Sequence, residues 1–522
     1  MVHSPNYLSI RVLLILLCWV FIFSACKNKK EAIHDSIPAD KIAVIYPDYS
    51  GTVIPPNIAP LNFEIEEKGK DYFIKIHSKK GRPIEIYSRN PEIIIPEAEW
   101  RSLLSVNQGN QLYFDVSVKT EADQWMRYSA IANTIAHEPI DGYLVYRKIH
   151  PSQNTWREMG LYQRNLQNYD ETRILENKYF KNGCCHCHAF CNNRTEKMTI
   201  DIRSKDYENS LLLVEGDNVN KVGLTFGFTS WHPSGRILAC SFNKPKLLIH
   251  ASRNEIRDIV DLDSWIGYYV IDSKQVKTTP QISRKDYLEN YPTWSPNGKY
   301  LYFCSAPILW DDRNKIPVES YDRVKYDLYR IGYDIENDQW SDLEPLILSD
   351  ETGLSINQPR ISPDGRWLSF SMCKYSCWPN YHPNSDLYIV DLNTAQTTGK
   401  FHYRKMEIST DQCESWHTWS SNSRWIVFSS KKENPLFSRT YMAYVDTTGG
   451  IHKSLLVPQK DPTFYQSYLK TYTIPELVVE PVSVKREKLA SVLRSSRKSK
   501  PDLPITMATP KAGTVIPQQE RE

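Results

Sequence analysis

Apolar and small or polar residues alternate in short runs along most of the chain, which is the pattern of strands with one buried face. Residues 367–372 alternate in this way, and residues 300–303 and 425–428 match them. Aromatic residues, which favour strands, are plentiful, with 32 Tyr and 14 Trp against only 20 Gly. The pattern predicts a mainly β protein.

One turn pattern recurs four times, each time directly before such a strand. In three copies a Pro fixes φ and a Gly two residues later supplies the positive φ of a tight hairpin, whereas the fourth copy has Ser at both positions. Further downstream of each copy, another strand ends in an acidic turn. Each unit therefore contains two hairpins, which make four strands. The copies are residues 230–236, 293–299, 360–366 and 418–424. Four-stranded units stacked radially make a β-propeller, which we expect over 197–480 with six blades.

The segments outside the repeats predict other domains. Strand-like runs at 59–65, 72–76, 111–116 and 142–146 predict an immunoglobulin-like β-sandwich over 42–150. Residues 151–196 form a connector in this scheme. The polar, initially basic residues 481–522 are too poor in large apolar groups to fold, so they predict a disordered tail.

The N-terminus predicts export. Val12 to Phe23 is apolar but too short to span a bilayer, and small residues precede Cys26. This pattern is typical of a lipoprotein signal peptide over 1–25, with Cys26 lipidated and 26–41 as a tether. A soluble secreted chain and an uncleaved anchor are the alternatives. The residue after Cys26 is Lys27 and not the Asp associated with inner-membrane retention. This favours an outer-membrane lipoprotein that faces the periplasm or the cell surface.

Composition and motifs narrow the function. The net charge of +3 is too small to give the protein a positive field that would attract nucleic acid. A nucleophile elbow has only one weak match, residues 223–227, with Thr at its centre. The sequence therefore identifies no catalytic residue, and whether the protein is an enzyme stays open.

A cysteine-rich segment carries the most specific chemistry. Cys184, Cys187 and His188 satisfy C-x-x-C-H, in which two thiols join haem vinyl groups and the imidazole binds iron. Haem attachment takes place outside the cytoplasmic membrane, which agrees with export. The sequence thus predicts one covalent c-type haem, with His188 as the proximal ligand.

Two alternatives remain for these cysteines. Cys184, Cys185, Cys187 and Cys191 could bind zinc together with neighbouring histidines. They could also form disulfides in an oxidising compartment, with 373 and 377 as a second local pair of cysteines.

The chain resembles a family of lipoproteins with TolB-like propellers. The matching stretches are residues 159–164, 187–190, 231–235, 419–425 and 456–462. The resemblance implies the propeller, the preceding β domain and haem. This chain departs from the family at Asp201, where a His is usual.

The second axial position of the iron is open. His232 and His417 are the candidates, and Met198 and Met372 are further ones. The leading hypothesis is an envelope lipoprotein that transfers electrons or senses redox state while its propeller docks a protein or glycan. The alternative is a non-catalytic scaffold that binds a protein or glycan and has structural cysteines.

Overall fold

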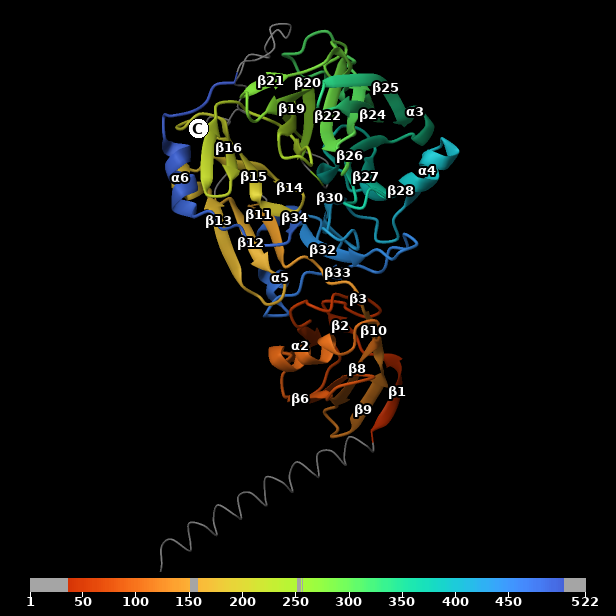
Figure 1. Cartoon of the computed structure of the whole chain (residues 1–522). Helices are drawn as coiled ribbons and strands as arrows, with labels where there is room; N and C mark the ends of the chain where they lie inside the picture. Colours follow the sequence, from red (N-terminus) through yellow and green to blue (C-terminus); the bar gives the residue numbers. More distant parts are fainter. Residues whose placement is uncertain (1–35, 151–157, 251–254, 256, 502–522) are drawn as a thin grey trace, which may run out of the picture. The chain divides into compact units, whose positions relative to one another are not determined.

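The computed structural model describes residues 36–150, 158–250, 255 and 257–501 (Figure 1). The expected signal peptide and Cys26 lie outside these residues. The chain divides into two compact units. Unit 1 comprises residues up to 51 with 60–135 and 458–466, and unit 2 comprises 52–59, 136–457 and the residues from 467 onward. No helix of the described residues is long and apolar enough to cross a membrane.

Unit 1 is built on two sheets and one helix. The larger sheet has the order β1-β9-β8-β10, with β5 paired to β8 and β6 paired to β5, and the smaller sheet is β2-β4-β7. Helix α2 (Glu97–Ser105) buries Trp100, Leu103 and Leu104. The immunoglobulin-like topology stays a prediction. The strands are β1 (Ile37–Ile42), β2 (Ile45–Tyr46), β4 (Phe63–Ile65), β5 (Asp71–Ser78), β6 (Ile84–Ser88), β7 (Glu92–Ile93), β8 (Gln111–Lys119), β9 (Trp125–Ser129) and β10 (Ile131–Ile135).

Unit 2 contains six four-stranded antiparallel sheets in its described residues. The first strand of each sheet contacts that of the next, and β34 contacts both β30 and β14, so these inner strands close a ring. This bears out a mainly β, propeller-like fold. From inner to outer strand, the sheets are β14 (Cys184–Cys191), β15 (Arg194–Arg203), β16 (Ser210–Glu215), β17 (Asn218–Val222); β18 (Thr229–Trp231), β19 (Ile237–Ile249), β20 (Arg257–Val270), β21 (Gln275–Lys277); β22 (Tyr287–Trp294), β23 (Tyr300–Pro307), β24 (Asp327–Asp334), β25 (Gln339–Ile347); β26 (Ser355–Ile361), β27 (Trp367–Cys373), β28 (Asp386–Asp391), β29 (Tyr403–Lys405); β30 (Glu414–Trp419), β31 (Trp425–Ser430), β32 (Arg439–Tyr444), β33 (Leu455–Leu456); and β34 (Thr471–Val478), β11 (Tyr143–Ile149), β12 (Gly160–Asn165), β13 (Glu171–Glu176).

The four repeated turns are hairpins between the first and second strands of their sheets, as the sequence predicts. Gly235, Gly298 and Gly365 lie at φ 67°, 71° and 77°. Ser423 takes the same position at φ 61° without a glycine. A positive φ closes a tight turn whose twist matches that of the strands it joins.

Two expected boundaries differ from the structure. The expected connector contains β12, β13 and β14, and β11, assigned to the N-terminal domain, is a strand of unit 2. The prediction of disorder from residue 481 is wrong for helix α6 (Arg486–Arg494), because Leu489, Ala490 and Leu493 give this charged segment one buried face. The remaining elements are β3 (Val53–Ile54), α3 (Ser349–Thr352), α4 (Leu392–Thr398), α5 (Phe464–Ser467) and the 3-10 helices η1 (Asn177–Phe180), η2 (Pro280–Ile282), η3 (Tyr321–Arg323) and η4 (Pro379–Tyr381).

Candidate ligand site at the centre of the ring

The inner strands share a β-bulge at one position. The strand register shifts there in β14, β22, β26, β30 and β34. Four bulge residues have left-handed backbone, with φ of 52° at Tyr291, 53° at Gln358, 52° at Trp416 and 53° at Ile474. Such a conformation costs about 1–3 kcal/mol per residue and is concentrated at functional sites. These residues therefore indicate a candidate functional site at the centre of the ring.

The bulge residues meet as an apolar cluster that we call the central plug. Phe228 stacks on Tyr291 with ring centroids 4.0 Å apart, and its centroid lies 5.7 Å from that of Trp416. The Gln358 side chain accepts a hydrogen bond from the backbone N–H of Trp416 at 2.9 Å. Equivalent positions of the six inner strands thus converge. They are His186, Phe228, Tyr291, Gln358, Trp416 and Ile474.

Two residues further along each inner strand lies a second set, the polar ring. Four of its six side chains hydrogen-bond to the backbone of the adjacent sheet, so they join the sheets to each other. Thr293 Oγ1 donates to the carbonyl of Pro359 at 2.7 Å, and Thr418 Oγ1 donates to that of Pro475 at 2.9 Å. The members of the polar ring are His188, Ser230, Thr293, Arg360, Thr418 and Glu476.

Glu476 and His188 form the ionisable part of the polar ring. Nε2 of His188 lies 3.6 Å from Oε2 of Glu476, and the backbone N–H of Phe190 donates to Oε1 at 3.3 Å. Burial raises the pKa of Glu476 to about 7, although the Phe190 N–H and the nearby Arg360 act against the shift. Burial also lowers the pKa of His188 to about 3, so the imidazole is neutral at physiological pH.

A second buried carboxyl group lies next to the central plug. Asp201 Oδ2 is 3.6 Å from His186 Nδ1 and 3.5 Å from Arg203 Nε. Burial raises the pKa of Asp201 to about 7. His186 Nδ1 is also 3.1 Å from the Cys187 sulfur. Asp201 therefore belongs to a buried polar cluster.

The predicted haem is wrong. Residues of the C-x-x-C-H motif form strand β14, where Cys184 and Cys187 pack into different hydrophobic clusters and are 4% and 8% exposed. One porphyrin needs both sulfurs on one open face with the imidazole aimed at its iron, whereas His188 is buried against Glu476. The described residues contain no group of three or more His, Cys, Asp or Glu side chains able to hold a metal ion.

The two alternatives for the cysteines are also wrong within the described residues. The absence of a metal-holding group excludes the zinc site there. All nine described cysteines are free and buried, so none of them forms a disulfide. In the expected local pair, Cys373 donates to the Tyr375 carbonyl at 3.0 Å and Cys377 to Asp261 Oδ2 at 3.2 Å.

The candidate axial ligands have structural positions. His232 Nδ1 lies 2.8 Å from Ser234 Oγ, and Nε2 lies 3.1 Å from the Gly298 carbonyl, so this histidine joins two neighbouring turns. His417 is buried in β30, and burial lowers its pKa to about 3. Met198 and Met372 are core residues, 0% and 2% exposed.

A cavity of about 80 Å³, which we call the mouth cavity, lies beside the central plug. Trp378, Tyr381 and Trp416 contribute aromatic surface to it. Three lining residues have buried polar atoms without a hydrogen-bond partner among the described residues. These atoms are Trp378 Nε1, Asn380 Oδ1 and Thr471 Oγ1. Buried polar groups are normally bonded, so these atoms are available to a polar ligand.

The mouth cavity is lined by cations. Glu255 pairs with two of them, since its carboxylate lies 2.9 Å from Arg257 Nε and 2.7 Å from Lys431 Nζ. Arg147 is held by neutral acceptors, the His186 carbonyl at 2.6 Å and Thr473 Oγ1 at 3.0 Å. No carboxylate of the described residues lies within ion-pair distance of Arg147. Three cations, Arg147, Arg257 and Lys431, therefore face the single carboxylate of Glu255, which leaves a net positive charge at the cavity.

Sequence analysis predicts the strands that follow the repeated turns but misses this site. The lining residues come from six separate segments, and only Trp416 adjoins a repeated turn. The only sequence signal was the aromatic or Gln residue three positions before each Trp or Ile of the repeat, at 228, 291, 358 and 416.

No protein-family model matches the chain, and no curated protein matches it. Among solved structures, a putative 6-phosphogluconolactonase from Bacteroides uniformis is 12% identical over 79% of this chain and 98% of its own, with a TM-score of 0.34. An oligogalacturonate lyase from Vibrio parahaemolyticus is 10% identical over 73% and 100%, with a TM-score of 0.33. A prolyl endopeptidase is 8% identical over 73% of this chain, which spans 42% of the endopeptidase, with a TM-score of 0.34. The activities in these names belong to those proteins.

Proposed function

We propose that the protein is a non-catalytic binding protein of the cell envelope that holds the acidic end of a glycan in its mouth cavity. The observation that carries the proposal is the combination of aromatic surface, polar atoms without protein partners, and the uncompensated Arg147 in one cavity. Sugars offer C–H faces to aromatic rings and hydroxyls to polar atoms, and a uronic acid adds a carboxylate for a guanidinium.

The proposed scaffold is a six-bladed propeller of TolB-like type. The six four-stranded sheets and the contact of β34 with β14 support this interpretation. Unit 1, with its two sheets, is the proposed immunoglobulin-like domain.

The proposed location is the outer membrane, with the chain anchored by lipid at Cys26. The support is the sequence pattern of residues 12–26, which lie outside the described part of the structure. In cells fed a labelled fatty acid, the wild-type chain should carry the label and the Cys26→Ser variant should not. Equal labelling of both chains would exclude this anchor.

Isothermal titration calorimetry tests the ligand. A galacturonic-acid trisaccharide should bind the purified protein, and a neutral galactose trisaccharide should bind at least tenfold more weakly. Tyr381→Ala, which removes one aromatic wall, should reduce the affinity for the acidic sugar about tenfold, since one such contact contributes about 1 kcal/mol or more.

Tyr403→Ala is the matched control. Tyr403 is a 38% exposed tyrosine of β29 and does not line the mouth cavity. The proposal fails if the acidic and neutral sugars bind equally, if neither binds, or if Tyr381→Ala and Tyr403→Ala weaken binding to the same extent.

A further inference from the structure

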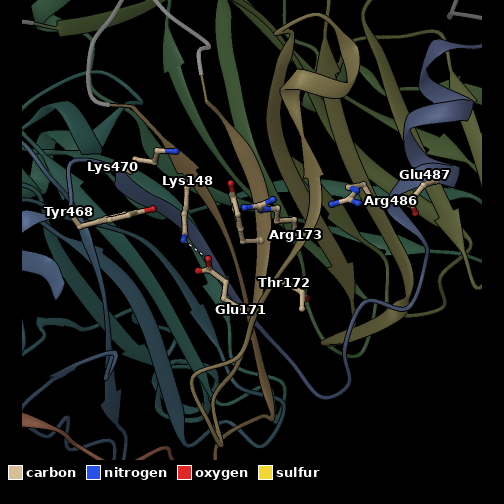
Figure 2. Close-up of a pocket in the computed structure, with 9 residues that line it drawn as sticks. Lys148, Glu171, Thr172, Arg173, Tyr468, Lys470, Arg486 and Glu487 are labelled. Carbon is tan, nitrogen blue, oxygen red and sulfur yellow. Dashed lines mark hydrogen bonds and ion pairs between the residues drawn. The ribbon is translucent and has the colours of Figure 1, made fainter. Parts of the chain in front are cut away.

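A larger cavity of about 630 Å³ lies against the sheet that closes the ring (Figure 2). Its walls come from five segments of unit 2, one of which contributes Tyr162 of β12. Lys148 belongs to β11, Arg173 to β13, Lys470 precedes β34, and Arg486 begins α6. None of the residues of the mouth cavity lines it, so it is a second and separate site.

The floor of this side pocket is a compensated ion pair. Figure 2 shows Lys148 extended toward Glu171, and the Lys148 Nζ lies 2.5 Å from Glu171 Oε1. The Lys148 side chain is only 7% exposed, and its ammonium lies 4.6 Å from the ring centroid of Tyr162 and 5.3 Å from that of Tyr468. The pair and its aromatic surroundings therefore form a rigid base.

The rim of the side pocket is cationic. Each rim cation has one carboxylate neighbour: Glu176 lies 3.5 Å from Arg173, Glu158 lies 3.0 Å from Lys470, and Glu487 lies 3.0 Å from Arg486. Glu158 and Glu487 are 70% and 71% exposed, and solvent-exposed pairs of this kind contribute little. Lys470 and Arg486 can therefore turn toward a ligand with little loss.

Four cations and two carboxylates line the side pocket, and this excess of positive charge favours an anion. Two of the cations are guanidinium groups, whose forked donors match the oxygens of a phosphate. Tyr468 adds apolar surface for an organic group, and the cavity has the size of a small-molecule site.

We propose that the side pocket binds a phosphate monoester, with Arg173, Lys470 and Arg486 holding the phosphate and Tyr468 contacting the organic part. The phosphate can belong to a free metabolite or to a lipid head group. Glucose 6-phosphate and vesicles containing phosphatidic acid are the two probes that distinguish these sources.

Titration of the whole protein with both probes is the test. At least one probe should bind, glucose itself should not compete, and the affinity should fall as salt is raised because the contacts are ionic. Arg173→Gln and Arg486→Gln should each weaken binding about tenfold, as expected when one charged hydrogen-bond donor to the phosphate is lost.

Arg366→Gln is the matched control. Arg366 is 33% exposed, close to the 31% of Arg486, and has one carboxylate partner, Asp391, at 3.1 Å outside the side pocket. The inference is overturned if neither probe binds, if glucose competes, or if Arg366→Gln weakens binding as much as Arg486→Gln does.

Discussion

His188 and Glu476 face each other across the junction at which the ring closes. Their side chains, 3.6 Å apart, come from β14 and β34, the inner strands of the first and last sheets to be completed. Burial favours the neutral form of both side chains. Ionisation of Glu476 therefore destabilises the junction.

Glu476→Gln should make the protein more stable at high pH. The pKa of Glu476 rises from 4.5 to about 7 on folding, so the folded state holds the proton more tightly than the unfolded state. The carboxyl group therefore costs stability progressively from pH 4.5 to pH 7, up to about 3 kcal/mol above pH 7. Urea unfolding should give similar free energies for variant and wild type at pH 4.5, and a more stable variant at pH 8.

Glu407→Gln is the control for this pH effect. Glu407 is 57% exposed and pairs with Arg404 on the surface. Its substitution should change stability by less than about 0.5 kcal/mol at both pH values. An advantage of Glu476→Gln that is the same at pH 4.5 and pH 8 would contradict the assigned protonation.

Two neighbouring valines test the closing strand. Val478 of β34 is 0% exposed and Val479 is 41% exposed. Val478→Asp should destabilise the protein by about 3 kcal/mol or more, because it buries an unpaired charge in the closing sheet. Val479→Asp should change stability by less than about 0.5 kcal/mol. Equal effects in thermal unfolding would show that the closing strand does not lie as described.

Phe228→Ala tests the central plug. The Phe228 ring is 5% exposed and contacts three other aromatic rings, so its loss leaves a cavity at the centre of unit 2. The free energy of unfolding should fall by about 3–5 kcal/mol. Tyr403→Ala on the outer strand β29 should cost less than about 1 kcal/mol. A small loss for Phe228→Ala would mean that the plug is loosely packed.

The described cysteines should be unreactive in the native protein. Burial raises the pKa of Cys184 to about 11 and that of Cys187 to about 12, so their thiolates are scarce at pH 8. A chromogenic disulfide reagent should titrate these thiols within minutes only after denaturation. Fast reaction of several thiols in the folded protein would contradict their burial.

The repeats allow most of the ring to be predicted, because the Pro and Gly of their turns specify a tight hairpin without help from distant residues. The sheet beginning at β14 lacks that turn. Its hairpin uses Asn192 and Asn193 at φ 54° and 57°, a two-residue turn that the sequence also allows. The closing sheet combines β34 with strands from the other end of the unit, which no local pattern reveals.

The haem prediction failed because cysteine spacing says nothing about local structure. The eight residues from Cys184 to Cys191 are nearly all buried as a strand, and the environment, not the spacing, determines what their thiols can bind. The mouth cavity and the side pocket were not predictable, since each combines segments that are distant in sequence.

The pairing of β34 with β11 sets the order in which the molecule can be made. Strands β11 to β13 leave the ribosome long before their missing neighbour β34, which follows the other five sheets along the chain. Until then the growing chain carries an open sheet edge, the kind of surface that recruits foreign strands. A chain that stops before residue 471 keeps that edge, so copies without β34 should aggregate or be degraded, and only chains that include this strand yield a durable product.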